Sequence, residues 1–122
     1  MYNEIKIRFK EPVYRVDREK GTVSCKLLYY TVYPSFLYKM CNIDTSLKTI
    51  ITIAKVGPED TFDEKTGKRV ALAKAERNAY KKVGKECFKH CKTFAKAYEK
   101  MYTFYAKANA VELHNSEYLK QF

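Results

Sequence analysis

The chain has no tryptophan, no apolar run near the ~20 residues that cross a bilayer, no Cys-x-x-Cys pair and no glycine-rich phosphate loop. These absences argue against a membrane-spanning helix and remove the commonest local signatures of zinc and nucleotide sites. The first ten residues, MYNEIKIRFK, are too highly charged for a signal peptide. We therefore expect a cytoplasmic protein without a membrane partner, whose four cysteines are reduced.

Residue types that carry catalysis are also scarce. His90 and His114 are isolated, and the local sequence assigns neither of them a nucleophile. Cys87 and Cys91 share one face of a helical segment beside His90, but zinc would need two further ligands. We read both cysteines as small core residues. We expect no enzyme activity, no catalytic residues, no metal and no cofactor.

What is present indicates one folded domain spanning residues 1–122. The chain of 122 residues is long enough for a hydrophobic core but not for two. A hydrophobic content of 46% with 15% aromatics is incompatible with a disordered chain. The eleven tyrosines and seven phenylalanines predict that the core, or an interface, is largely aromatic.

The N-terminal half, residues 1–57, predicts an antiparallel sheet of three or four strands. Ile5, Ile7 and Phe9 alternate with charged residues, which is typical of a strand with one wet face. The segments VYRV and TVSCKLLYYTV predict a hairpin, in which Gly21 can adopt the positive φ that a tight turn needs.

The rest of this half contains one more clear strand. The segment LKTIITIAKV is rich in β-branched residues, and Gly57-Pro58 ends it. The segment YPSFLYKMCNID between the hairpin and this strand is irregular. We interpret it as a partly buried loop or a short edge segment.

Residues 58–110 predict helix. Thr61 followed by Glu64 is a capping-box pattern, and Asp60 is a competing N-cap. Carboxylates gather where the helix dipole is positive, at Glu59, Asp60, Asp63 and Glu64. Gly67 is costly inside a helix, and close approach of the helix to the strands is the simplest reason for it.

From Val70 to Ala108 the apolar residues recur at alternating spacings of three and four, which predicts one buried stripe. A single helix from Thr61 to Ala108 would be too long for a domain of 122 residues to cover along its whole length. Either the helix breaks near Gly84 and folds back, which we favour, or its second half pairs with another copy. Residual aromatic surface then predicts an oligomer interface at Phe94, Tyr98, Met101, Tyr102 and Tyr105. Residues 111–122 read as a polar tail with one further helical turn.

The net charge of +10 is concentrated on this helical segment. Lys65 to Lys107 contains thirteen Lys and Arg against three acids, whereas the rest of the chain has eleven of each sign. The helical spacing places a lysine ridge opposite the apolar stripe, and a polyanion would bind it. The candidate nucleic-acid-binding residues are Lys81, Lys82, Lys85, Lys89, Lys92, Lys96 and Lys100. A simple solvated face and an acidic protein partner are the alternatives.

One stretch resembles a group of small uncharacterised proteins from phages and prophages of Gram-positive bacteria. The pattern comprises Ala54, Pro58-Glu59-Asp60-x-Phe62, Gly67-Lys68 and Ala71-x-Ala73-Lys74-Ala75-Glu76. The resemblance implies a phage or prophage origin, a strand-then-helix architecture and a location in the host cytoplasm. Other members carry a Cys-His-type pair where this chain has Val56-Gly57, which argues against a metal site. The resemblance supplies no catalytic residues.

Together these features predict an α+β domain in which an antiparallel sheet packs on a long basic helix, broken near Gly84. We expect a non-enzymatic binding protein that recognises nucleic acid or a nucleoprotein complex through its lysine-rich helical face. The alternative is a phage inhibitor of a host protein or defence system (anti-CRISPR-like) that acts through protein contacts. A purely structural oligomer, such as a homodimer, is a third hypothesis.

Overall fold

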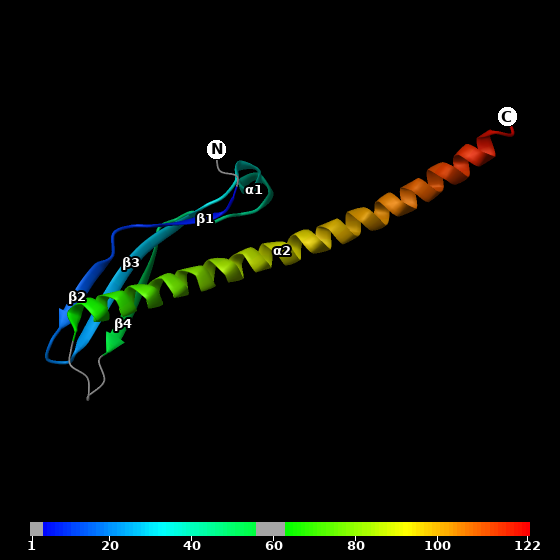
Figure 1. Cartoon of the computed structure of the whole chain (residues 1–122). Coiled ribbons are helices and arrows are strands. Elements are labelled where there is room, and N and C mark those ends of the chain that lie inside the picture. Colours follow the sequence, from blue (N-terminus) through cyan, green and yellow to red (C-terminus); the bar gives the residue numbers. More distant parts are fainter. Residues whose placement is uncertain (1–3, 56–62) are drawn as a thin grey trace. The chain divides into compact units, whose positions relative to one another are not determined.

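The computed structural model describes residues 4–55 and 63–122. The chain divides into two compact units, residues 1–85 and residues 86–122, and each is described by itself. The first, the N-terminal unit, contains a four-stranded antiparallel sheet, a short helix and the beginning of the long helix α2 (Figure 1). The predicted α+β class with an antiparallel sheet and a long C-terminal helix is confirmed.

The longest strand, β3 (Thr22–Val32), is the centre of the sheet. β1 (Lys6–Phe9) and β2 (Val13–Asp17) pair with successive parts of β3, and β4 (Lys48–Lys55) pairs along its other edge. Pro12 lies between β1 and β2, because a proline has no N–H to donate to a ladder. The first edge of the sheet is therefore one extended segment interrupted at this proline.

The hairpin and the last strand agree with the predictions from the sequence. Gly21 has a φ of 63° in the turn between β2 and β3, a conformation that glycine adopts without steric cost. The β-branched segment predicted as a strand forms β4. The Lys20 N–H donates to Asp17 Oδ1 at 3.1 Å and supports the turn from the side of β2.

The segment after β3 differs from the prediction of a loop or edge segment, because Ser35–Met40 forms the short helix α1. Pro34 precedes the helix with extended backbone, and a proline in that position fixes the direction of entry. The Tyr33 N–H donates to the Tyr38 hydroxyl at 3.1 Å, so a side chain from the helix itself satisfies the end of β3. Short-range contacts of this kind have no periodicity that a sequence pattern would reveal.

The core lies between one face of the sheet and α2. Val23, Cys25, Leu27 and Tyr29 of β3 are fully buried on this face, as their alternation predicts. α2 contributes small residues at a spacing of four: Gly67, Ala71, Ala75 and Ala79. A Cβ built on Gly67 would lie 2.7 Å from Val23 Cγ2, which confirms that this glycine permits close approach to the sheet. The Thr52 hydroxyl adds a hydrogen bond of 2.6 Å to the Ala71 carbonyl of α2.

α2 begins at Glu64, and Asp63 is its N-cap, because the Asp63 carbonyl accepts a helical hydrogen bond from the Gly67 N–H at 2.9 Å. Asp63 accepts hydrogen bonds from the Lys65 N–H at 3.1 Å and from the Thr66 hydroxyl at 2.6 Å, and these bonds satisfy donors of the first turn. The bond from Thr66 is the main reason why the pKa of Asp63 is lowered. The capping residues predicted at Asp60 and Thr61, and the adjoining Glu59, lie outside the described residues.

The predicted break near Gly84 is wrong, because α2 is a continuous helix from Glu64 to Leu119. A glycine costs a helix only about 1 kcal/mol relative to alanine, and residues with high helix propensity flank Gly84 on both sides. A Cβ on Gly84 would meet nothing within 4 Å, so no neighbouring group forces the chain to turn there. Residues 111–119, expected to belong to a polar tail, also continue the helix.

Candidate nucleic-acid interface

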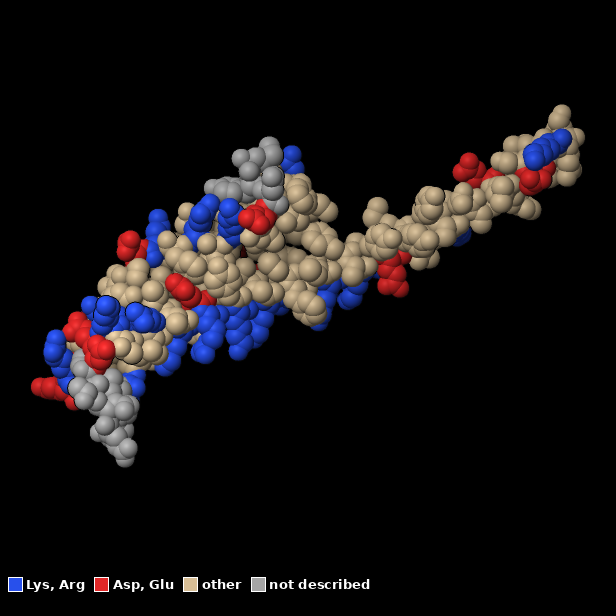
Figure 2. Space-filling view, viewed as in Figure 1, with Lys and Arg blue, Asp and Glu red and all other residues tan. Residues whose placement is uncertain are grey.

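The N-terminal unit brings three of the seven predicted lysines together. Lys81, Lys82 and Lys85 are exposed on α2 and line a shallow groove of ≈ 350 Å³ with Asn78 and residues 49–51 of β4. The groove forms because the small residues of α2 hold the helix close to the sheet, so that the next turns of the helix flank the outer edge of β4. Figure 2 shows Lys and Arg gathered along one side of this part of α2.

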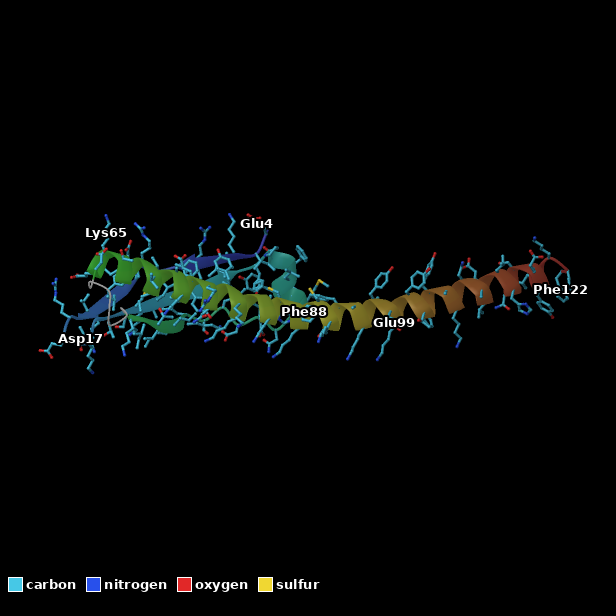
Figure 3. The ribbon with its side chains drawn as sticks, turned by 60° about the horizontal axis from the view of Figure 1, so that its bottom comes forward. Glu4, Asp17, Lys65, Phe88, Glu99 and Phe122 are labelled. Carbon is cyan, nitrogen blue, oxygen red and sulfur yellow. The ribbon has the colours of Figure 1, made fainter. Side chains whose placement is uncertain are left out.

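The C-terminal unit carries the other four, and its described structure is the remainder of α2. Lys89, Lys92, Lys96 and Lys100 are all exposed. At about 100° per residue they fall within an arc of about 80° on the helix surface, and Lys107 lies in the same arc. In Figure 3, on either side of Glu99, side chains that end in nitrogen point from one edge of the ribbon and rings from the other. The helix therefore has a basic face and an aromatic face.

No ion pair within residues 4–55 and 63–122 involves any of the seven lysines. Other cations of the same chain are paired: Arg18 contacts Glu64 at 2.8 Å, and Lys48 contacts Asp44 at 3.0 Å. Lys92 is the one ridge lysine with a described partner of another kind, since its Nζ lies 4.8 Å from the centre of the Phe88 ring. The ridge lysines are therefore available to an external anion.

Two residues interrupt the basic face in the C-terminal unit. Glu99 and Thr103 join Lys96 and Lys100 around a shallow hollow of ≈ 300 Å³. The Thr103 hydroxyl donates to the Glu99 carbonyl at 2.8 Å, so this polar group is satisfied within the helix. The negative charge of Glu99 reduces the local positive potential but does not neutralise the four lysines.

The stripe that was predicted to be buried is largely exposed in the C-terminal unit. Tyr98, Met101, Tyr102 and Tyr105 are 70, 73, 58 and 65% exposed, while Phe94 is half-buried. The predicted stripe is also wrong in the N-terminal unit, where Val70 and Tyr80 are exposed and the small-residue row is buried instead. The stripe of spacing three and four continues on α2, but within the C-terminal unit no described element covers it.

Some of these aromatic residues contact one another. The rings of Tyr98 and Tyr102 are stacked at 6.0 Å, and the rings of Tyr102 and Tyr105 lie 6.3 Å apart. The members of each pair are about one turn apart on the same helix, so these contacts pre-organise the aromatic face without covering it.

The cysteines and histidines form no metal centre among the described residues. Cys87 is half-buried and Cys91 is exposed, whereas the prediction placed both in the core. His90 Nε2 lies 3.9 Å from Glu86 Oε1, one turn away on the helix. Cys25 is buried in the sheet, and this burial raises the pKa of its thiol.

The sheet itself carries a basic surface that residue patterns within single strands do not reveal. Basic residues occupy the outward alternating positions of β1, β2 and β3, and they cluster only when the strands pair. The alternation was visible within single strands, but the register that brings the strands together was not.

Comparison of the chain with protein-family models, curated proteins and solved structures finds no match in any of the three. In the part of the chain that the structure describes, neither helix combines the length and the apolar character needed to cross a bilayer.

Proposed function

We propose that this protein binds nucleic acid, alone or within a nucleoprotein complex, through the lysines of α2. The observation that carries the proposal is the arrangement of seven exposed lysines, none of which forms an ion pair within the described residues. Each of the two units presents its own share of these lysines. The proposal therefore does not depend on how the units are placed relative to one another.

The energetics of the helix support an external anion. Like charges three or four residues apart destabilise a helix by a few tenths of a kcal/mol per pair. Lys85, Lys89, Lys92, Lys96 and Lys100 form four such successive pairs, which Glu86 and Glu99 offset in part. A phosphate backbone would remove this repulsion and release condensed counterions, and the second effect is a large driving force for binding.

The test is a titration of labelled DNA and RNA by fluorescence anisotropy at several salt concentrations. We expect affinity to fall with salt, with a slope of about −0.7 per phosphate contact for single strands and about −0.9 for duplex. A variant with Lys89, Lys92, Lys96 and Lys100 changed to Gln should bind more weakly and lose about 3 units of that slope.

A charge-matched control separates a binding face from a general effect of net charge. Changing Lys20, Lys39, Lys65 and Lys120 to Gln removes the same charge from exposed positions away from the ridge. We expect this control to keep most of the affinity and slope. Equal losses in both variants, or no binding at low salt, would overturn the proposal.

We propose in addition that the aromatic face of the C-terminal unit pairs with a second copy of the chain. The apolar residues of this face alternate at spacings of three and four, the pattern by which two helices pack in a coiled coil. Two copies of the chain would present the same stripe to each other. Exposed apolar patches of this kind mark interaction sites in soluble proteins. The lysines lie on the opposite side of the helix, so pairing would leave them open to nucleic acid.

The rival function is inhibition of a host protein or defence system by a phage protein, through protein contacts. The exposure of the tyrosines on α2 favours this alternative, because tyrosine is enriched at protein interfaces. A nuclease-treated pull-down from host lysate distinguishes the two. Under the rival, a single host protein is retained after nuclease treatment and is lost when Tyr98 and Tyr105 are changed to Ala, and nucleic-acid binding is absent.

A further inference from the structure

The sheet has a second face that α2 does not cover. α2 packs against the face that carries the fully buried residues of β3, and the opposite face takes the alternate residues of all four strands. Val13, Ile51 and Ile53 on this opposite face are 62, 66 and 58% exposed, so no described element of the N-terminal unit covers them. We call this surface the open sheet face.

The strand register arranges the open sheet face in six rows that cross the sheet. Each row contains one basic residue: Lys6, Arg8, Lys10, Lys26, Arg15 and Lys55, in order from the end of β3 at Val32 to the end at Thr22. Lys10 extends β1 by one position, because its N–H donates to the Leu28 carbonyl at 2.9 Å. Successive rows are about 6.6 Å apart, since two residues of a strand separate them.

Acidic residues are scarce on this face. Within the described strands, Asp17 is the one acid at these outward positions, and it accepts the hydrogen bond from the Lys20 N–H in the turn. Glu4 precedes β1, and its Oε1 lies 3.6 Å from the Lys6 Nζ. Among the described strands, the rows that contain Lys10, Lys26 and Arg15 hold no carboxylate, so these three cations keep a positive potential on this face.

Apolar and aromatic groups alternate with these cations. Lys26 pairs across the sheet with Val13 on one side and Ile51 on the other, so a cation stands between two exposed aliphatic side chains. Tyr30 pairs with Arg8, and the Lys10 Nζ lies 5.8 Å from the centre of its ring. A surface for phosphates alone would gain nothing from these groups, whereas unstacked bases offer flat apolar faces to them.

We propose that the open sheet face is a second nucleic-acid site and that it takes a single strand. Arg15, Lys26 and Lys10 contact successive phosphates, and a base stacks on Tyr30. The open sheet face favours a single strand because the bases of a duplex are turned inward, away from Tyr30 and Ile51. This site is distinct from the lysines of α2, and it does not rest on the function proposed for them.

The experiment compares two kinds of variant of the full chain, measured with a labelled single-stranded oligonucleotide. Arg15→Gln with Lys26→Gln removes two phosphate contacts, so affinity falls and the salt slope decreases by about 1.4. Tyr30→Leu keeps apolar volume but removes the π-face. It lowers single-strand affinity about tenfold and leaves the salt slope unchanged.

Two controls accompany these variants. Lys39→Gln with Lys120→Gln makes the same change in net charge at exposed positions outside both surfaces, and it keeps the single-strand affinity and slope. Thermal unfolding shows that each variant is folded. The matching duplex, titrated in parallel, binds Tyr30→Leu and the unaltered protein equally.

Three results would overturn the proposal. The first is an unchanged single-strand affinity in both sheet variants, with all binding lost in the α2 variant; this outcome leaves the function of α2 standing. The second is an equal loss of duplex and single-strand binding in Tyr30→Leu. The third is that polyglutamate displaces the labelled strand as effectively as unlabelled oligonucleotide does, because the face would then recognise negative charge alone.

Discussion

The two stretches of α2 differ in whether their apolar face is buried. Residues 64–85 bury a row of glycine and alanines against the sheet, whereas residues 86–119 expose tyrosines, phenylalanines and methionine. A small side chain allows the helix backbone to approach the strands, and the sheet supplies the large residues of that interface. The difference shows that side-chain size, as much as hydrophobicity, indicates which face of a helix its own domain covers.

The charged residues differ between the same two stretches. In the first, Lys68 pairs with Glu64 at 3.4 Å, and the Lys74 Nζ donates to the Ile53 carbonyl at 3.1 Å. In the second, none of the four ridge lysines has an ion-pair partner among the described residues. Lys68 and Lys74 thus contribute to contacts within the fold, whereas the four lysines farther along the helix form no ion pair with the described residues.

Enlarging a buried alanine should have the largest effect. Ala75 is fully buried, so we expect Ala75→Leu to lower the free energy of unfolding by about 2–3 kcal/mol through overpacking. Ala73 is exposed on the same helix, and Ala73→Leu should change stability by less than about 0.5 kcal/mol. Urea denaturation measures both. Equal effects would contradict the packing described for the first stretch.

Truncating the aromatic face should weaken association without weakening the fold. We expect Tyr98→Ala with Tyr105→Ala to raise the dimer dissociation constant at least about tenfold in sedimentation equilibrium, because large aromatic side chains dominate such interfaces. Thr103→Ala, on the lysine side, is the control and should leave the dimer intact. A monomeric parent protein, or a dimer insensitive to both tyrosines, would refute the pairing.

The two helical glycines should respond to alanine with opposite signs. Gly67→Ala places a methyl group 2.7 Å from Val23 Cγ2, and we expect a net loss of about 1 kcal/mol. Gly84→Ala meets nothing, so helix propensity alone should stabilise by about 0.5–1 kcal/mol. Thermal unfolding of the pair isolates the steric contribution. A gain from both substitutions would show that α2 does not pack closely on β3.

The smallest expected effect is the pH dependence at the start of α2. The pKa of Asp63 is lowered in the folded protein, mainly by the Thr66 hydroxyl, so its contribution to stability is full above the ordinary value of 3.8. That contribution is lost as the pH falls through the lowered value. Asp63→Asn cannot titrate, and we expect its stability to depend less on pH below about 4. Denaturation of both proteins across this range is the measurement.

Much of the N-terminal unit was predictable because local rules agree with the packing there. The alternation in β3 and the freedom of Gly21 are local properties, and the structure follows both. A hydrophobic pattern does not identify the row of small residues on α2 as the buried one, because the larger residues Val70 and Tyr80 outweigh alanine in it. The break predicted at Gly84 overestimated a cost of about 1 kcal/mol against a long run of residues with high helix propensity.

The candidate sites divide in the same way. The lysine face of α2 follows from residue spacing alone, since a helix repeats every 3.6 residues wherever it lies. The open sheet face could not be found in this way, because its cations come from strands far apart in the chain. Lys10 and Lys26 become neighbours of Leu28 and Ile51 only through the pairing of β3 with its partners.

The amino-acid sequence by itself determined the strands, the helix and the placement of the lysines on one side of that helix. Each of these depends on interactions within a few residues, and their periods can be read from the chain. The tertiary structure decided which row of α2 is buried, which aromatic residues remain exposed, and which cations share the outer face of the sheet. Those outcomes depend on how closely two backbones can approach and on strand register, which involve residues distant in the sequence.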